Sequence, residues 1–164
     1  PPAFPAPSFE AMGPEMEKMF RAFKDPVEGP RVVMDENLFV EQVLPGFVNR
    51  TLGEGAMRAY RAPFLARGDR RPVLAWPRQV PIAGEPASTT EALNAISDFM
   101  AKTEMPVLLL YAEPGAVVPP SAVDWYIERI ANLETSFVGQ GFHFIQEDHP
   151  DAIGREIADW MRRN

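Results

Sequence analysis

One histidine of this chain lies in a stretch where acid–base chemistry is possible. The residues after Phe137 run from an apolar, strand-like segment through Gly139-Gln140-Gly141 into Phe142-His143-Phe144. Catalytic residues favour loops that rigid elements hold in place, and histidine exchanges a proton near neutral pH. A histidine between phenylalanines is, however, more often a hydrogen-bonded structural residue than a catalyst. The pattern makes His143 a candidate general base and leaves the structural alternative open.

The composition indicates a globular chain and excludes several kinds of site. Of the 164 residues, 46% are hydrophobic and 10% are aromatic, which is enough for a packed core. The net charge is −7 and no run of Lys or Arg occurs, which argues against nucleic acid or anionic membrane as a partner. With no cysteine and only two histidines, His143 and His149, we expect no metal site.

The sequence contains no segment that would place it in a membrane. No apolar run approaches the roughly 18–20 residues of a membrane span, and the first residues lack a basic segment followed by an apolar one. We expect a soluble, cytoplasmic protein. The chain begins at Pro1 rather than at a methionine, which suggests that other residues precede it.

The first half of the chain predicts short helices rich in Met and Phe. Apolar residues at helical spacing indicate one helix that begins near Pro14 and a second that Asp35 caps. A third helix would begin at the capping-box pattern Thr51–Glu54 and end at Pro63. Residues 67–87 lack this periodicity, so we expect irregular backbone there, with a hinge at its end (Pro81–Pro86).

The second half predicts a β-α-β unit. A helix that Ser88 caps leads into the apolar run Pro106–Tyr111, which is typical of a strand buried on both faces. A helix that begins at Pro119 should bury Val123, Tyr126, Ile127 and Ile130, and a second strand, Thr135–Val138, should lie parallel to the first. The last helix begins at Pro150 and should pack inward through Ile153, Ile157, Trp160 and Met161.

Two strands are too few for the helices around them. A parallel sheet of two strands leaves both edges open and cannot bury helices on both faces. We therefore expect the chain to be the C-terminal part of a larger α/β protein, with its first strands upstream of Pro1 or on another chain.

The order of the elements resembles the C-terminal half of an α/β-hydrolase, and more narrowly a haloalkane dehalogenase. The resemblance covers essentially the whole chain. It implies an α/β-hydrolase fold of which only the C-terminal portion is present. Residues 1–84 would form a helical cap with its leading segment, and residues 85–164 the last part of the core. Four segments carry the resemblance most specifically: Asp35–Glu41, Tyr60–Phe64, Pro81–Pro86 and Gly141–Asp148.

The resemblance implies a catalytic role for His143 and a divided active site. His143 falls on the family's catalytic histidine, the base that activates water. The acid of many such hydrolases would match Gly115, which cannot orient an imidazole. In the subgroup resembled here the acid is a glutamate just before the cap, hence upstream of Pro1, and Glu113 is the alternative within the chain. The nucleophilic aspartate, its following tryptophan and the halide-binding asparagine would lie in the N-terminal half.

The implied reaction is hydrolytic dehalogenation. An aspartate displaces halide from an alkyl carbon, and water, activated by the histidine, hydrolyses the resulting ester; no metal or organic cofactor takes part. The implied partners are a small apolar halogenated substrate, water, halide ion and the N-terminal half of the same protein. Apolar residues of the cap and of the core loops are candidates for the pocket wall: Phe20, Phe39, Phe47, Val80, Ala116, Val117 and Phe144.

Two other interpretations remain. An epoxide hydrolase or esterase could share the scaffold, although epoxide hydrolases usually need tyrosines in the lid and Tyr60 is the only one there. A serine in place of the upstream aspartate would indicate an esterase. Alternatively, the chain is a split or engineered tag segment that binds its complementary half. Tags of this kind generally need the histidine disabled, and His143 is intact.

Overall fold

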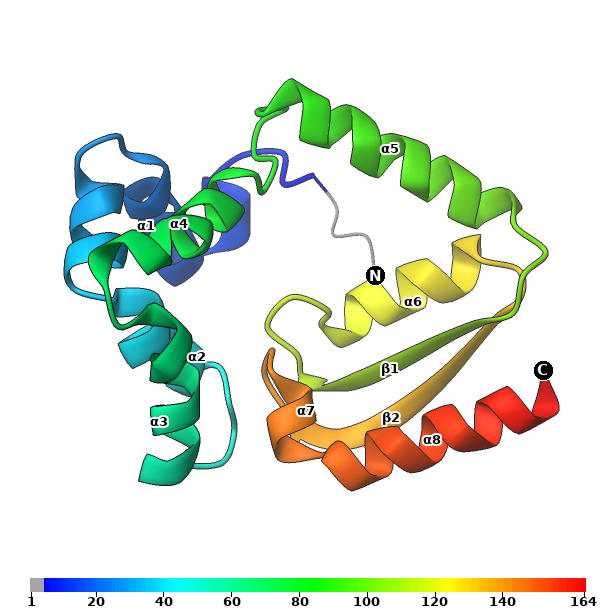
Figure 1. The fold of residues 1–164 in the computed structure, drawn as a ribbon. Coiled ribbons are helices and arrows are strands. Elements are labelled where there is room, and N and C mark those ends of the chain that lie inside the picture. The colour runs from blue at the N-terminus through cyan, green and yellow to red at the C-terminus, as the bar shows by residue number, and fades with distance from the viewer. Residues whose placement is uncertain (1–4) are drawn as a thin grey trace. The chain divides into compact units, whose positions relative to one another are not determined.

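A computed structural model describes residues 5–164 (Figure 1). The chain divides into two compact units. The first, here called the helical unit, comprises the described part of Pro2–Val43 together with Gly53–Ala95. The second, here called the α/β unit, comprises Leu44–Leu52 and Ile96–Asn164. Each unit is described by itself. In the described part of the chain, no helix combines the length and apolar character that a membrane span requires.

The helical unit begins with a short 3-10 helix, Glu10–Met12, and helix α1, Pro14–Lys24. Pro14 stands in the first turn of α1, where its missing N–H needs no partner. Phe20 and Phe23 are buried on one face of α1, as their spacing predicts. At the other end of α1, Arg78 donates hydrogen bonds from Nε to the carbonyl of Phe23 (2.8 Å) and from Nη2 to that of Asp25 (2.7 Å). A cation therefore satisfies the carbonyls that this helix end leaves open.

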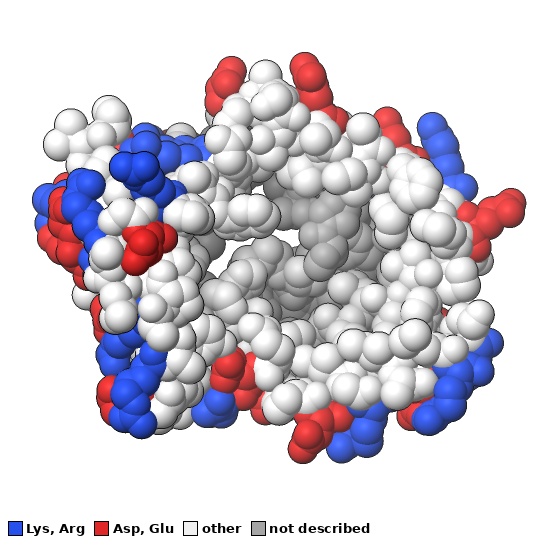
Figure 2. Space-filling view, viewed as in Figure 1, with Lys and Arg blue, Asp and Glu red and all other residues white. Residues whose placement is uncertain are grey.

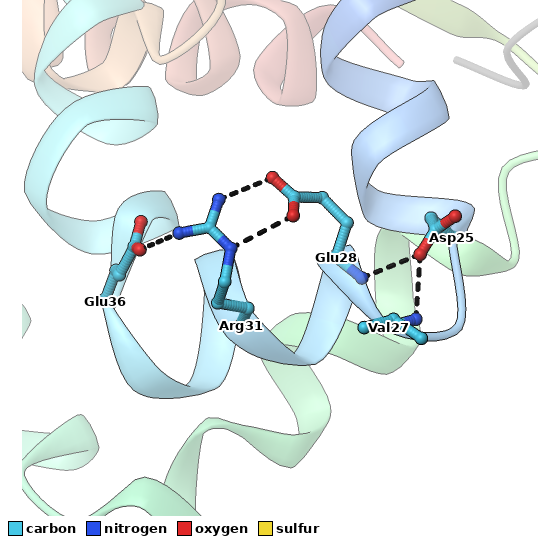
Figure 3. A network of polar contacts seen from close by, with 5 residues as sticks. All are labelled: Asp25, Val27, Glu28, Arg31 and Glu36. Carbon is cyan, nitrogen blue, oxygen red and sulfur yellow. Dashed lines mark hydrogen bonds and ion pairs between the residues drawn. The ribbon is translucent and has the colours of Figure 1, made fainter.

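A turn after α1 starts the next helical segment, Pro30–Asp35, which sequence periodicity did not reveal. The carboxylate of Asp25 accepts hydrogen bonds from the backbone N–H groups of Val27 (2.8 Å) and Glu28 (2.7 Å). One turn later, Arg31 pairs with both Glu28 and Glu36 (Figure 3). Figure 2 shows that acidic and basic side chains are intermixed over this unit, as such pairs would produce.

The prediction that Asp35 caps the second helix is wrong. Asp35 is the last residue of the segment Pro30–Asp35, and the chain reverses at Asn37, whose φ is 54°. A further helical segment, Phe39–Val43, then continues into α2, Leu44–Gly46, which ends at Pro45-Gly46 as expected. Asparagine tolerates the left-handed conformation better than most residues, so the break falls there rather than at the aspartate.

Helix α3, Glu54–Arg61, and a 3-10 turn, Ala62–Phe64, follow. The α-helix ends before Pro63, as predicted. Ala62 still has helical backbone angles (φ −53°, ψ −39°), but Pro63 has no N–H to donate to the carbonyl four residues back, and the chain continues as the 3-10 turn. The capping box expected at Thr51 is not formed. Gly53 is the N-cap residue and no side chain caps the helix.

The expectation of irregular backbone over residues 67–87 is also wrong. A 3-10 helix, Arg67–Arg70, leads into α4, Arg71–Arg78. One proline of α4 lies in its first turn, where no N–H is needed, whereas Pro77 lies inside the helix and cannot donate to the carbonyl four residues back; the helix ends one residue later, at Arg78. Leu74 and Pro77, three residues apart, are buried. The two prolines concealed this periodicity in the sequence.

The core of the helical unit is closed. Phe23, Val33 and Ile82 have exposed fractions of 1%, 0% and 2%. The hinge expected at Pro81–Pro86 is a tight turn in which Ile82 and Glu85 exchange backbone hydrogen bonds (2.9 and 3.0 Å). Ala83, with φ of 53°, donates a bond to the carbonyl of Ala6.

The α/β unit contains the predicted β-α-β arrangement. Strand β1, Val107–Pro114, lies parallel to β2, Leu133–Gly141, and helix α6, Pro120–Arg129, connects them. Helix α5, Ala87–Lys102, precedes β1 and starts in the helical unit. Two helices complete the chain: the short α7, Ile145–Asp148, and the longer α8, Pro150–Arg163, which lies on the opposite side of the sheet from α6 (Figure 1).

Burial in the α/β unit is incomplete. Leu109, Val123, Tyr126 and Ile130 form its core between β1 and α6. The expectation that β1 is buried on both faces is wrong for this chain, because only two of its eight residues are buried. Three residues expected inside are exposed instead: Ile127 by 52%, Ile157 by 41% and Met161 by 67%. Among residues 5–164 the sheet has only these two strands, so parts of it and of its helices have no covering element.

Candidate active site

The loops that follow β1 and β2 lie together at the carboxyl ends of the two strands. The backbone N–H of Gly115 donates a hydrogen bond to the carbonyl of Gly141 (3.1 Å), and that of Ala116 donates to Phe142 (2.8 Å). A Cβ at Gly141 would lie 3.2 Å from the Cβ of Ala112, which is tighter than ordinary packing, so the glycine favours this close approach. The carboxyl ends of parallel strands are the usual place for a ligand site in open α/β sheets.

His143 stands in this loop, and its backbone is fixed from outside the loop. Its N–H and that of Phe144 both donate to the carbonyl oxygen of Phe47, at 3.1 and 3.2 Å. The imidazole lies between aromatic rings, with ring centres 4.8 Å from Phe144 and 6.3 Å from Phe47. The side chain stays accessible to solvent, yet the surrounding protein removes part of its hydration and so lowers its pKa below the ordinary value. The imidazole is therefore neutral near neutral pH, the form that accepts a proton.

No carboxylate of residues 5–164 forms a hydrogen bond or ion pair with the His143 imidazole. Gly115 occupies the position where an acid would be expected, with φ of 64°. A Cβ there would lie 2.3 Å from the carbonyl oxygen of Val118, which no side chain can tolerate. Glu113 stands on β1 opposite Gln140 of β2. If His143 is a base, the acid that orients its imidazole is therefore not one of the carboxylates of residues 5–164.

Carboxylates at the far end of the loop bind a different segment of the chain. Asp148 accepts hydrogen bonds from the backbone N–H groups of Asn49 (2.9 Å) and Arg50 (2.8 Å). Arg50 in turn binds Glu147 twice, through the carbonyl oxygen of its backbone and through its carboxylate. Sequence reasoning missed these contacts because the partners are almost a hundred residues apart and neither segment has a distinctive pattern.

The second histidine is structural. Its Nε2 lies 2.8 Å from the carbonyl oxygen of Gln140. A Cβ on Gly139, whose φ is 135°, would lie 2.5 Å from the His149 ring, so the glycine makes room for it. Among residues 5–164 no group of three histidine or carboxylate side chains is arranged to hold a metal ion.

The residues predicted to line a pocket fall in different places. Phe47 and Phe144 contact the His143 ring, and Ala116 is bonded to the same loop. Val117 is next to Ala116 and is 42% exposed. The other three belong to the helical unit, where Phe20 is a core residue and Phe39 and Val80 pack against that core. The seven residues belong to two separate units, so whether they line one pocket stays a prediction.

No family model matches the chain. Individual relatives do. A haloalkane dehalogenase from Bradyrhizobium diazoefficiens is 45% identical over 143 residues, which cover 87% of this chain and 46% of that protein. A haloalkane dehalogenase from Sphingobium indicum is 44% identical over 152 residues, which cover 92% of this chain and 50% of that protein.

Solved structures match in the same way. The structure of haloalkane dehalogenase DbeA from Bradyrhizobium elkani superposes with a TM-score of 0.94 at 40% identity, covering 98% of this chain and 56% of that one. That of haloalkane dehalogenase DatA from Agrobacterium tumefaciens C58 gives 0.85 at 34% identity, covering 92% and 52%. The chain thus spans about half the length of the relatives it matches, and it corresponds to their C-terminal half.

Proposed function

We propose that this chain, which is homologous to the C-terminal half of haloalkane dehalogenases, supplies the catalytic base of a hydrolase that acts on carbon–halogen bonds. The observation that carries the proposal is His143. It is a solvent-accessible imidazole at the carboxyl end of the sheet, held by two backbone hydrogen bonds to Phe47, and desolvation lowers its pKa. That combination keeps a proton acceptor available at neutral pH.

The proposed reaction has two steps, and His143 acts in the second. In the first, a carboxylate of the protein outside this chain attacks the carbon that bears the halogen. The carbon–halogen bond breaks, halide leaves with the electron pair, and an alkyl ester forms. In the second, a water molecule attacks the ester carbonyl while His143 takes its proton. The alcohol leaves with the proton that His143 had taken, and the carboxyl group that remains releases the second proton of the water to solvent, which restores the carboxylate.

General base catalysis of this kind commonly contributes roughly 10²–10⁴-fold to a rate. It requires an imidazole in the right tautomer, which a carboxylate usually fixes. Because His143 has no such partner among residues 5–164, we place the orienting acid, like the nucleophile, in the N-terminal half of the full protein. The helical unit would serve as the cap of that protein, and the reaction needs no metal or cofactor.

The N-terminal half is also the proposed partner for the uncovered surface of the α/β unit. Three large apolar side chains of α5 and β2 are exposed, Ile96 by 45%, Phe99 by 55% and Phe137 by 48%, and their burial by further residues would stabilise the unit. Relatives twice as long as this chain contain further residues that could cover such a surface.

The test is the single-turnover behaviour of the His143→Phe variant in the full-length protein with a brominated alkane. The variant should release one equivalent of bromide per active site and then stop, because the ester forms but is not hydrolysed. The matched control is His149→Gln, which removes the other imidazole and keeps a group able to bind the Gln140 carbonyl. It should turn over repeatedly. Continued turnover by His143→Phe would overturn the assignment of the base.

A separate result would move the reaction to another class. If the unaltered protein releases no halide but hydrolyses carboxylic esters or opens epoxides, the substrate class is wrong, and this result leaves the assignment of His143 as the base untouched. Comparing bromoalkane, ester and epoxide substrates with the same protein sample therefore tests the substrate class independently of His143.

A further inference from the structure

A single short segment of the chain, Leu44–Leu52, holds the His143 loop at both of its ends. At the near end, the carbonyl oxygen of Phe47 accepts the N–H groups of His143 and Phe144 (3.1 and 3.2 Å). At the far end, the carboxylate of Asp148 accepts the N–H groups of Asn49 and Arg50 (2.9 and 2.8 Å). The loop thus donates two bonds to the segment and accepts two from it.

The arginine of this segment adds a second attachment at the far end. Arg50 donates from Nε to the carbonyl oxygen of Glu147 and pairs through Nη2 with its carboxylate. Glu147 is the less exposed partner, with 20% of its side chain accessible against 47% for Arg50. An isolated ion pair on a surface contributes little, but here charged groups bind backbone atoms, and such bonds are stronger and fix the backbone direction.

Asp148 also contacts the end of strand β2. A Cβ on Gly141 would lie 3.5 Å from Oδ2 of Asp148 and 3.2 Å from Cγ2 of Ile145. The carboxylate therefore lies where the strand, the short helix α7 and the segment Leu44–Leu52 come together. His143 is at the near end of the loop, where its backbone N–H binds the Phe47 carbonyl (3.1 Å), and Asp148 anchors the other end five residues later. Among the described residues, no side-chain hydrogen bond sets the position of the imidazole.

We propose that Asp148 and Arg50 are positioning residues for His143. This inference rests on the proposed function. By clamping the far end of the loop to Leu44–Leu52, the two side chains would fix the distance between the imidazole and the ester that it must hydrolyse. A displacement of about 1 Å can slow a reaction by roughly 10²-fold. The clamp therefore acts on the hydrolytic step and leaves halide displacement, which does not use the imidazole, unaffected.

The experiment uses the full-length protein and follows both steps separately by rapid mixing with a bromoalkane. Asp148→Asn keeps the size of the side chain, removes its charge and replaces one accepting oxygen by a donor, so it can keep at most one of the two backbone bonds. We expect the rate constant for ester hydrolysis to fall about tenfold to a hundredfold. The rate constant of the bromide burst and its amplitude per folded protein should stay unchanged.

A control variant and a second pair of variants make the result specific. Glu134→Gln breaks an exposed ion pair of the same kind with Arg163 (2.8 Å) in the same unit and should change neither step. Arg50→Met should slow hydrolysis, and Arg50→Lys, which restores the charge but not the fork of donors, should rescue part of the loss. If Asp148→Asn does not fold, the Arg50 variants still test whether these contacts position His143.

Each outcome has a definite meaning. Slower hydrolysis with an unchanged burst supports the clamp. A smaller burst with both rate constants unchanged means that the contacts only stabilise the fold, and this overturns the inference. Unaltered protein that turns over while Asp148→Asn and both Arg50 variants hydrolyse the ester at the normal rate also overturns it and leaves the proposed function intact. Absence of any halide release from the unaltered protein instead refutes the proposed function.

Discussion

The helical unit and the α/β unit differ in how completely they bury their own apolar side chains. In the helical unit, Phe23, Val33 and Ile82 are at most 2% exposed. In the α/β unit, residues 5–164 supply two strands to the sheet, and large apolar residues of α5, β2 and α8 remain exposed by 41–67%: Ile96, Phe99, Phe137, Ile157 and Met161.

The difference shows which unit closes its own core and which does not. A core that is closed by its own helices gains its full hydrophobic stabilisation within the chain, at roughly 25 cal/mol per Å² of buried apolar surface. A strand with an uncovered edge and face does not. The candidate active site belongs to the α/β unit, whose sheet is incomplete. If the acid that would orient His143 and the further strands of the sheet both lie in the proposed N-terminal half, the two absences have one explanation.

The largest predicted effect contrasts one phenylalanine from each unit. In the 164-residue chain, Phe23→Ala should lower the free energy of unfolding by about 3–5 kcal/mol, because it leaves a cavity in a closed core. Phe99→Ala, which removes a side chain that is 55% exposed, should cost less than about 0.5 kcal/mol. Urea unfolding followed by circular dichroism measures both.

The same pair can be repeated in the full-length protein. There the cost of Phe99→Ala should rise towards that of a buried residue, because the N-terminal half is proposed to cover this surface. Equal costs of Phe99→Ala in the short chain and in the full protein would contradict the contrast between a closed and an incomplete unit.

A second prediction concerns two glycines of the α/β unit and is of intermediate size. Gly115→Ala should destabilise by about 1–3 kcal/mol, since φ is 64° and a Cβ would lie 2.3 Å from the Val118 carbonyl oxygen. Gly154→Ala, in the middle of α8 with no atom within 4 Å of the new Cβ, should stabilise by roughly 0.5–1 kcal/mol. Thermal unfolding of the two variants should shift in opposite directions. A neutral Gly115→Ala would mean that the site edge is less rigid than the structure indicates.

The smallest predicted effect is a pH-dependent one in the helical unit. Arg61 binds the carboxylate of Glu41 through two nitrogens, and these hydrogen bonds lower the pKa of Glu41. The pair therefore stabilises the fold above the ordinary glutamate pKa, and this contribution is lost as the pH falls through the lowered value. Arg61→Met should destabilise the fold slightly near neutral pH, since both side chains are about one-third exposed (35% and 33%) and solvent screens the pair, and should destabilise it less in acid.

The control for this prediction is Glu41→Gln, alone and combined with Arg61→Met, so that the coupling of the two side chains can be extracted from a double-mutant cycle. Unfolding curves at several pH values give the coupling. A coupling energy that grows as the pH falls would contradict the assignment, because the charged carboxylate is the form that the arginine binds.

Much of the fold could be predicted from periodicity alone. The β-α-β unit, helix α1 and the end of α3 before Pro63 all follow from apolar spacing and proline chemistry. The resemblance to the C-terminal half of haloalkane dehalogenases, and with it the α/β-hydrolase fold class, is confirmed by the comparisons. Helix α4 was missed because its prolines concealed the regular spacing of its apolar residues. The burial of β1 was overestimated because the pattern of a buried strand assumes neighbouring elements on both faces, and the described residues do not supply them.

The candidate site could be predicted only where the type of a single residue was enough to suggest its role. A histidine in a glycine-bracketed loop is visible in a sequence, and so is the absence of an acid at Gly115. The bonds from Phe47, Asn49 and Arg50 to the histidine loop cross almost a hundred residues and mostly involve backbone atoms, which have no sequence pattern. Whether Phe20, Phe39 and Val80 line a pocket stays a prediction.

The most direct test of the divided active site is to find where the alkyl group is bound. The full-length His143→Phe protein is treated with a bromoalkane, digested, and mapped by mass spectrometry. The account predicts one alkyl ester per molecule on a carboxylate outside residues 1–164. An ester on Glu113 or on any other residue of this chain would contradict it, and so would a protein that releases bromide without carrying an alkyl group.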